Sequence, residues 1–109
     1  MVKISESPGQ LVATSGATTI TLDRNAGKAI VQRKLLLWSR KPVEMPLSDI
    51  CECAVDSVVD GASGAEICKT LLLTRGGAAW ALPADDKKEA QTAAVQLSTF
   101  LGLGTPTIH

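Results

Sequence analysis

Apolar and polar residues alternate through much of the chain up to residue 82, which is the pattern of half-buried β-strands. Two such runs, Thr18–Asp23 and a run that starts at Lys28, flank a polar segment that contains Gly27. We predict that they form a β-hairpin in which Gly27 takes a positive φ. A shorter run, residues 10–14, is expected to supply the preceding strand. Because an isolated hairpin is marginally stable in water, the other elements must complete its core.

The rest of this region predicts further strands. Residues 28–40 are apolar on both faces, so we expect a bend or bulge within this segment. Residues 50–59 and 66–75 form the next two strands, and a tight turn at Gly76–Gly77 leads into residues 78–82. The side chains expected to face the core from these last three strands are Cys51, Cys53, Val55, Ser57, Val59, Ile67, Leu71, Leu73, Trp80 and Leu82.

The period of the apolar residues changes to that of a helix after Pro83. Asp86 is a suitable N-cap, and Glu89 three residues later completes the sequence signature of a capping box. Gly102 is a typical C-terminal stop. Between these ends, one apolar stripe is expected to face the core through Ala90, Ala94, Leu97 and Leu101.

Together these elements predict a mainly β fold, α+β by content, with six or seven antiparallel strands in a bent sheet or small barrel. One C-terminal amphipathic helix is expected to bury the open end of that sheet. A chain of 109 residues suits a single domain. We place the domain at residues 10–103, between a loose tail at residues 1–9 and a frayed tail at residues 104–109. No apolar run reaches the length of a membrane span and no secretory signal is evident, so we expect a soluble, cytoplasmic protein.

The net charge is zero at neutral pH, but the charges are unevenly distributed. Residues 1–41 carry seven cationic and two acidic side chains, and residues 42–109 carry four and nine, so the two parts have net charges of +5 and −5. This asymmetry fits either ion pairs between neighbouring strands or one basic and one acidic face. With 3% aromatic residues and no net charge, nucleic-acid binding is not expected.

Residue types that carry enzyme chemistry are sparse. His109, the single histidine, is the last residue, so no Ser-His-Asp or Cys-His arrangement is expected. Cys51, Cys53 and Cys68 are predicted to be reduced and mostly buried, with a disulfide from Cys68 to one of the other two as the alternative. A zinc site would need a fourth ligand that the pattern does not supply. We therefore expect no catalytic residues, no metal and no cofactor.

The order of the elements resembles that of bacterial pleckstrin-homology-like (PH-like) domains. The resemblance covers residues 10–103. It rests on the hairpin ITLDRNAGKAIVQRK, the segment LLLWSRKPVEMPLSDICECAVD, the hairpin LLLTRGGAAWALP and a closing helix that ends in TFLGL. It implies a bacterial protein that serves as a binding or assembly module rather than an enzyme, an implication that comes from the fold alone.

Two surfaces are candidates for binding. If Leu35 and Leu37 face the core, Trp38 lies outside with Leu36 and Arg40 and forms a partner surface for a protein or a second copy of the chain. If the bend lies elsewhere, Trp38 belongs to the core. The second surface is basic and comprises Arg24, Lys28, Arg33, Lys34 and Lys41.

The basic surface predicts contact with anionic lipid or an acidic partner, or else protection of a sheet edge against aggregation. Eukaryotic PH domains bind phosphoinositide headgroups through cations of an early hairpin. Here Arg24 and Lys28 occupy such a hairpin without the full spacing, so headgroup recognition is not expected. The sequence thus predicts a non-enzymatic module for protein–protein interaction or self-assembly, with peripheral binding to anionic lipid as the alternative.

Overall fold

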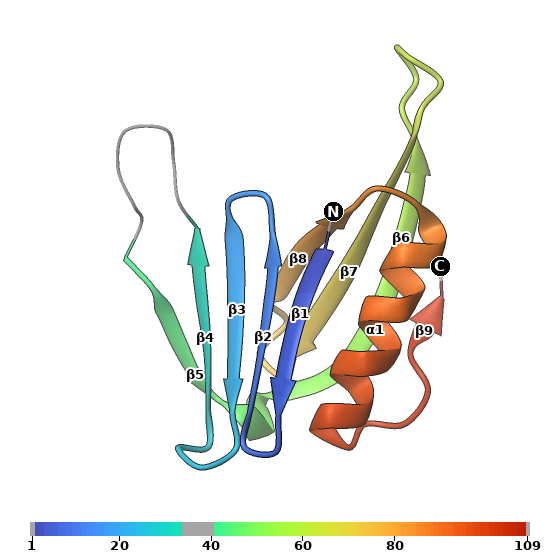
Figure 1. Cartoon of the computed structure of the whole chain (residues 1–109). Helices are drawn as coiled ribbons and strands as arrows, with labels where there is room; N and C mark the ends of the chain where they lie inside the picture. Colours follow the sequence, from blue (N-terminus) through green and yellow to red (C-terminus); the bar gives the residue numbers. More distant parts are fainter. Residues whose placement is uncertain (1, 34–40, 109) are drawn as a thin grey trace.

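The computed structural model describes residues 2–33 and 41–108, which form two β-sheets and one α-helix (Figure 1). The first sheet has the order β1-β2-β3-β4-β5, with β1 (Val2–Ser7), β2 (Gln10–Ser15), β3 (Thr18–Asp23), β4 (Lys28–Arg33) and β5 (Val43–Pro46). The second has the order β8-β7-β6-β9, with β6 (Ile50–Val59), β7 (Glu66–Thr74), β8 (Ala79–Ala84) and β9 (Thr107–Ile108). A 3-10 helix, η1 (Leu47–Asp49), links the sheets, and α1 (Lys87–Leu101) precedes β9. The predicted mainly β fold with one C-terminal helix is confirmed.

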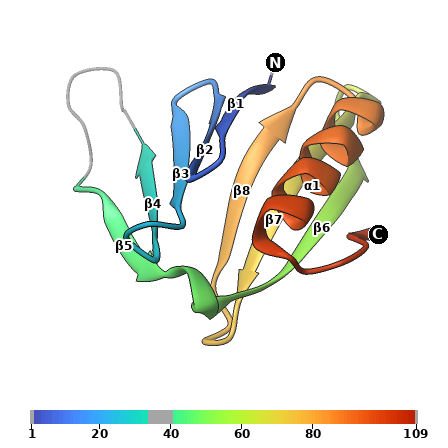
Figure 2. The same cartoon turned by 60° about the horizontal axis from the view of Figure 1, so that its bottom comes forward.

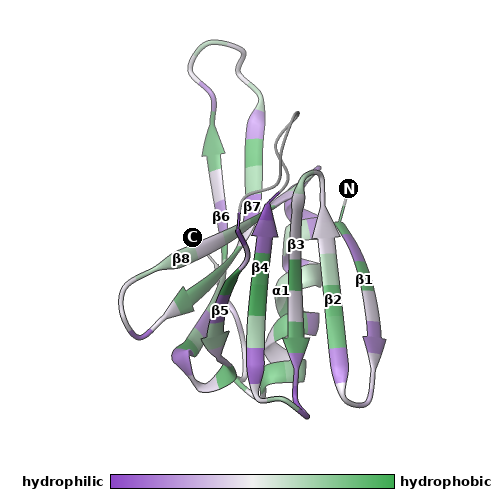
Figure 3. Cartoon of the chain, turned by 90° about the vertical axis from the view of Figure 1, so that its left-hand side faces the viewer, coloured by the Kyte–Doolittle hydropathy of each residue, from purple (hydrophilic) through white to green (hydrophobic). Residues whose placement is uncertain are grey.

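The predicted hairpin is confirmed as β3 and β4, which pair antiparallel from Thr18 opposite Arg33 to Asp23 opposite Lys28. Gly27 in the connecting turn has φ of 68°, a conformation that side chains with a Cβ rarely adopt. Hydrophobic and hydrophilic residues alternate along the strands of the first sheet (Figure 3). This alternation puts the apolar residues on one face, where they are buried. The fully or nearly buried side chains of this face are Leu11, Ala13, Ile20, Leu22, Ala29 and Val31.

The prediction for the inward face of β7 is wrong. Ile67 is exposed, and Leu71 and Leu73 are only partly buried. The buried side chains of β7 are Cys68, Thr70 and Leu72. Because β7 carries three consecutive leucines, its own pattern does not distinguish its two faces. The choice is made by packing, since the register aligns Leu72 with Cys53 of β6 and Trp80 of β8 on the side that faces the core.

Strand β6 follows the prediction in its middle and departs from it at both ends. Cys53 and Val55 are buried as expected. Cys51 is exposed, because an irregularity in the pairing between Ile50 and Glu52 shifts the alternation at that point. Val59 is exposed because β6 extends past the helix and past the last residue of β8.

Helix α1 begins and ends where its capping residues predict. The Asp86 carboxylate accepts a hydrogen bond from the Glu89 backbone N–H at 2.7 Å, and Gly102 ends the helix with φ of 71°. Glu89 Oε1 accepts from the backbone N–H groups of Asp85 and Val2, each at 3.0 Å, so it ties the helix start to β1. Of the predicted stripe, Ala90, Ala94 and Leu97 are buried, and Leu101 is partly buried against the core. The other buried side chains of the helix are Ala93, Ser98 and Phe100.

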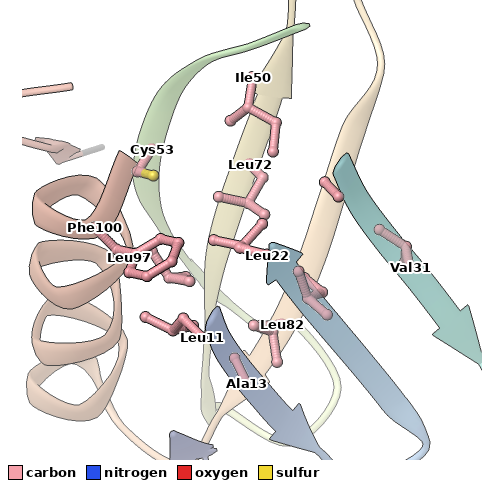
Figure 4. Packing of buried hydrophobic residues seen from close by; sticks show 12 residues of the cluster. Leu11, Ala13, Leu22, Val31, Ile50, Cys53, Leu72, Leu82, Leu97 and Phe100 are labelled. Carbon is pink, nitrogen blue, oxygen red and sulfur yellow. The ribbon is translucent and has the colours of Figure 1, made fainter. Parts of the chain in front are cut away.

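The core lies where α1 and the inner faces of both sheets meet (Figure 4). Leu97 and Phe100 project from α1 towards Leu11 and Leu22 of the first sheet and Leu72 of the second. A smaller cluster lies farther along the second sheet, under the first half of α1, and comprises Val55, Cys68, Ala90 and Ala94. The helix therefore contributes to both parts of the interior.

The two sheets do not close into a barrel, which corrects that part of the expected architecture. They meet near Ser15, whose Oγ donates to the carbonyl oxygen of Pro83 in β8. Strand β8 forms an edge, and Pro83 has no N–H to donate to another strand there. On the side of β4 and β5 the two sheets splay apart (Figure 2).

Both expectations about the chain ends are wrong. Residues 2–7 form β1, which pairs along its whole length with β2, and Ile4 packs against the core. The alternation of Val2 and Ile4 before the turn at Pro8–Gly9 is the signal that the prediction missed. At the other end, residues 107–108 pair in parallel with β6. Ser98 Oγ donates to the Gly104 carbonyl oxygen at 2.6 Å and helps to fold the chain back after the helix.

Candidate functional site

The predicted partner surface lies outside the described residues. Leu36, Trp38 and Arg40 belong to the segment 34–40, as does Lys34 of the basic set. Whether Trp38 is core or surface therefore stays a prediction with two alternatives. The cations of the basic set that the structure describes are Arg24, Lys28, Arg33 and Lys41.

Arg24 is an exposed residue whose side chain is bonded to two other parts of the chain. Its guanidinium donates to the Phe100 carbonyl oxygen at 2.5 Å and to the Pro8 carbonyl oxygen at 3.1 Å. It also lies 4.0 Å from the centroid of the Phe100 ring, within the range of a cation–π interaction. Arg24 therefore links the β3–β4 turn to the last turn of α1, where a cation favours the helix dipole.

We expect Arg24→Ala to lower the free energy of unfolding by about 1–3 kcal/mol, because it removes two hydrogen bonds from a charged donor and a cation–π contact. Urea denaturation followed by circular dichroism measures this change. Arg75→Ala is the matched control, since Arg75 is also an exposed arginine in a hairpin turn. If both substitutions cost the same, Arg24 does not fasten the turn to the helix.

The remaining described cations fall into two separate places. Lys28 lies at the start of β4, 4.0 Å from the Glu44 carboxylate, in a pair whose side chains are both more than half exposed. Arg33 is the last residue of the same strand, so about 16 Å of extended backbone separates the two. The basic residues therefore do not form one continuous patch among the described residues.

Arg33 and Lys41 lie together on the open side of the molecule, beside a cleft of about 270 Å³. We call this the open cleft; it is lined by Val31, Arg33, Lys41, Val43, Ala79 and Trp80. The first sheet's register places Arg33 on the same face as buried Val31, which pairs with Val43. A cation thus continues the inward-facing row of apolar side chains. Among the described residues, neither Arg33 nor Lys41 has an ion-pair partner.

Trp80 forms the wall of the open cleft that belongs to the second sheet. Its ring packs against the main core cluster, and its indole Nε1 is buried without a hydrogen-bond acceptor in the described part of the chain. A buried donor without a partner costs about 1–3 kcal/mol.

This arrangement suits an anionic group attached to an apolar segment. Arg33 and Lys41 supply positive charge at the entrance, and Val31, Val43 and Trp80 supply apolar surface below it. Carboxylates form their strongest hydrogen bonds with such cations. The volume of the open cleft, about 270 Å³, is near the lower end of the volumes of ligand pockets. The cleft therefore suits a few small side chains.

The sequence identified the two cations of this site but not its walls. Arg33 and Lys41 belong to the predicted basic set, and Trp80 was expected to face inward. Nothing in the local pattern brings β8 next to β4 and β5, because that proximity depends on how the two sheets pack. The placement of Arg33 two residues after Val31 is the local signal that a cation continues the inner face.

A second hollow lies between β1 and α1 and has a volume of about 440 Å³. This hollow is the groove between the helix and the strands, which is a second place where a partner could bind. Several of its polar side chains are already engaged: Glu89 accepts from Val2, and Gln96 Nε2 donates to Glu6 Oε1 at 3.4 Å. Its lining holds one cation, Lys88, together with the carboxylates of Asp86 and Glu89, whereas the open cleft is lined by two cations and no carboxylate.

The three cysteines lie in different places and differ in burial. All three are free thiols, so no disulfide joins them. Cys51 is exposed, whereas Cys53 belongs to the main core and Cys68 to the smaller cluster. Burial raises the pKa of the Cys53 thiol to about 12 and raises that of Cys68 as well. Within residues 2–33 and 41–108, no three His, Cys, Asp or Glu side chains gather in a way that could hold a metal ion.

Comparison of the chain with models of protein families, with curated proteins and with solved structures finds no match. The resemblance to PH-like domains therefore stays a prediction from the sequence. Among the described residues, no helix combines the length and the hydropathy that crossing a bilayer requires. The open cleft is consequently interpreted from its own geometry.

Proposed function

We propose that this protein is a non-enzymatic module that binds acidic segments of proteins in the open cleft. The observation that carries the proposal is the pair of cations, Arg33 and Lys41, which have no carboxylate partner among residues 2–33 and 41–108 and lie beside apolar side chains of both sheets. Cations in such a place attract a carboxylate, and the apolar floor adds affinity for the residues beside it.

The alternative, peripheral binding to anionic lipid, draws on the same cations. A flat membrane surface is best met by cations that share one face. Arg24 is bonded within the protein and Lys28 lies near Glu44, at the other end of β4 from Arg33. The separation of these cations gives a protein ligand more support than a bilayer.

A labelled peptide of alternating valine and aspartate is a direct probe of the open cleft. We expect it to bind at least tenfold more tightly than the same peptide with asparagine, and to weaken as salt screens the charges. Fluorescence anisotropy measures both. Binding should be lost in the double variant Arg33→Glu/Lys41→Glu. Phosphatidylserine vesicles, tested by co-sedimentation, report on the lipid alternative.

Lys3→Glu/Lys28→Glu is the matched control, because it changes the net charge equally at two exposed lysines away from the cleft. The control variant should retain most of the affinity. If the two double variants bind the peptide equally well, or if aspartate and asparagine peptides bind alike, the open cleft is not the site. In that case Arg33 and Lys41 protect an exposed sheet edge.

A further inference from the structure

The hairpin of β6 and β7 extends beyond the rest of the molecule (Figures 1 and 3). Strand β8 ends at Ala84, which pairs with Cys68, so residues 58–67 have no third strand beside them on that side. We call residues 58–67 the arm. Its exposed apolar side chains are Val58, Val59 and Ile67, with 48%, 68% and 46% of their surface accessible. Most large exposed hydrophobic residues of the described chain lie here, which is typical of an interaction surface.

The arm is acidic and its tip is a hydrogen-bonded turn. Its charged residues are Asp60 and Glu66, and it carries no cation. The Asp60 carboxylate accepts from Ser63 Oγ at 2.7 Å and from the Ala62 backbone N–H at 3.4 Å, and the Asp60 N–H donates to the Ala65 carbonyl at 2.8 Å. These bonds lower the pKa of Asp60, so the carboxylate stays charged in mildly acidic solution. A fixed acidic tip loses little entropy on binding.

The arm and the open cleft are complementary in charge, polarity and size. On the arm, Asp60 and Glu66 lie at the tip end of an exposed apolar strand pair, and in the cleft two cations lie beside apolar side chains. The tip between Asp60 and Glu66 consists of glycine, alanine and serine, which suits a cleft of about 270 Å³. We infer that the arm of one copy inserts into the open cleft of a second copy, an inference that rests on the proposed function.

The contact must form between molecules. Within one chain the arm and the β4–β5 side lie at opposite sides of the molecule in both views (Figures 1 and 2). Because the two surfaces differ, the contact is head-to-tail: each copy that fills a cleft still presents its own arm. Such contacts form rings when the rotation closes and filaments when it does not.

A membrane is a poorer occupant for the arm than a second copy. The arm contains no tryptophan, tyrosine or cation, the residues that anchor a protein at a bilayer surface. Asp60 and Glu66 would be repelled by anionic lipid. The same two carboxylates are what Arg33 and Lys41 of another copy would attract.

Two variants isolate the two sides of the contact. Arg33→Glu/Lys41→Glu disables the cleft, and Val59→Ser/Asp60→Asn/Glu66→Gln disables the arm at exposed positions while keeping a side-chain oxygen at residue 60. Circular dichroism confirms that both are folded. Sedimentation velocity then gives the mass. We expect the mass of the wild type to rise with concentration and fall with salt, and each variant alone to be a monomer.

The 1:1 mixture of the two variants decides the geometry. Each variant keeps the surface that the other has lost, so the mixture should form a dimer and nothing larger. The association constant of each variant with itself should be at least tenfold weaker than in the mixture. Lys3→Glu/Lys28→Glu should assemble as the wild type does.

Three results would overturn the inference: a wild type that stays monomeric at every concentration, a mixture that stays monomeric, or a cleft variant that assembles with itself. The peptide experiment separates this failure from that of the proposed function. If the aspartate peptide binds through Arg33 and Lys41 while the wild type stays monomeric, the cleft serves a different protein. If neither peptide nor second copy binds, both proposals fail.

Discussion

Leu97→Ala is expected to lower the free energy of unfolding by about 2–5 kcal/mol, the cost of removing a buried leucine and leaving a cavity. Leu97 is completely buried and lies where α1 meets the inner faces of both sheets (Figure 4). Neighbouring side chains come from β2, β3 and β7, so few of them can move to fill the space. Urea denaturation followed by circular dichroism measures the effect, which is a large fraction of the stability of a small domain.

Val95→Ala on the same helix is the control. Val95 is exposed, so its truncation should change the unfolding free energy by no more than about 0.5 kcal/mol. Alanine also favours the helix slightly more than either residue it replaces. A Leu97→Ala protein as stable as Val95→Ala would show that α1 does not fill the interior between the sheets.

The thiol of Cys53 should react with iodoacetamide roughly a thousandfold more slowly in the folded protein at pH 8 than after denaturation. The thiolate is the reactive form, and a pKa of about 12 leaves folded Cys53 with roughly 10³-fold less of it than the same thiol at its ordinary value of 9.0. Burial also blocks access of the reagent to Cys53, whereas Cys51 is exposed. Mass spectrometry of tryptic peptides should find a single rapid modification in the folded state and three after denaturation.

The same pKa shift predicts how stability changes at alkaline pH. Folding raises the pKa of Cys53, so the folded state favours the protonated thiol, and this contribution is intact below the unfolded value of 9.0. It is lost progressively as the pH rises from about 9 towards 12. Cys53→Ala should remove this part of the pH dependence, and Cys51→Ser should leave it. Equal labelling of Cys51 and Cys53 in the folded protein would contradict the assigned burial.

Elements whose signals are local were predictable from the sequence. The β3–β4 hairpin depends on alternation within each strand and on Gly27, and α1 depends on Asp86 and Gly102 at its ends. These signals lie within a few residues of what they determine. Strand β1 has the same kind of alternation, but it is short and its apolar residues Val2 and Ile4 are only partly buried, so the sequence pattern predicts a tail there.

Features that depend on packing between distant segments were not predictable in the same way. The leucines of β7 are apolar on both faces, so burial of Leu72 and not of Leu71 follows from the position of α1. The open cleft is a similar case, because Arg33 and Trp80 become neighbours only through the arrangement of the two sheets. The failure of the barrel to close also depends on where β8, with Pro83 at its edge, meets β2.

The meandering order of the strands has a consequence for how the chain acquires its structure. Every antiparallel ladder among the described residues joins strands that follow one another along the chain, and the short parallel ladder of β9 with β6 is the exception. Loops between consecutive strands cost little closure entropy, so each sheet can form by adding one neighbouring strand at a time. The main core draws on both sheets and on α1, which follows all of the antiparallel strands in the sequence. The slowest step of folding should therefore be the packing of the two sheets against this helix.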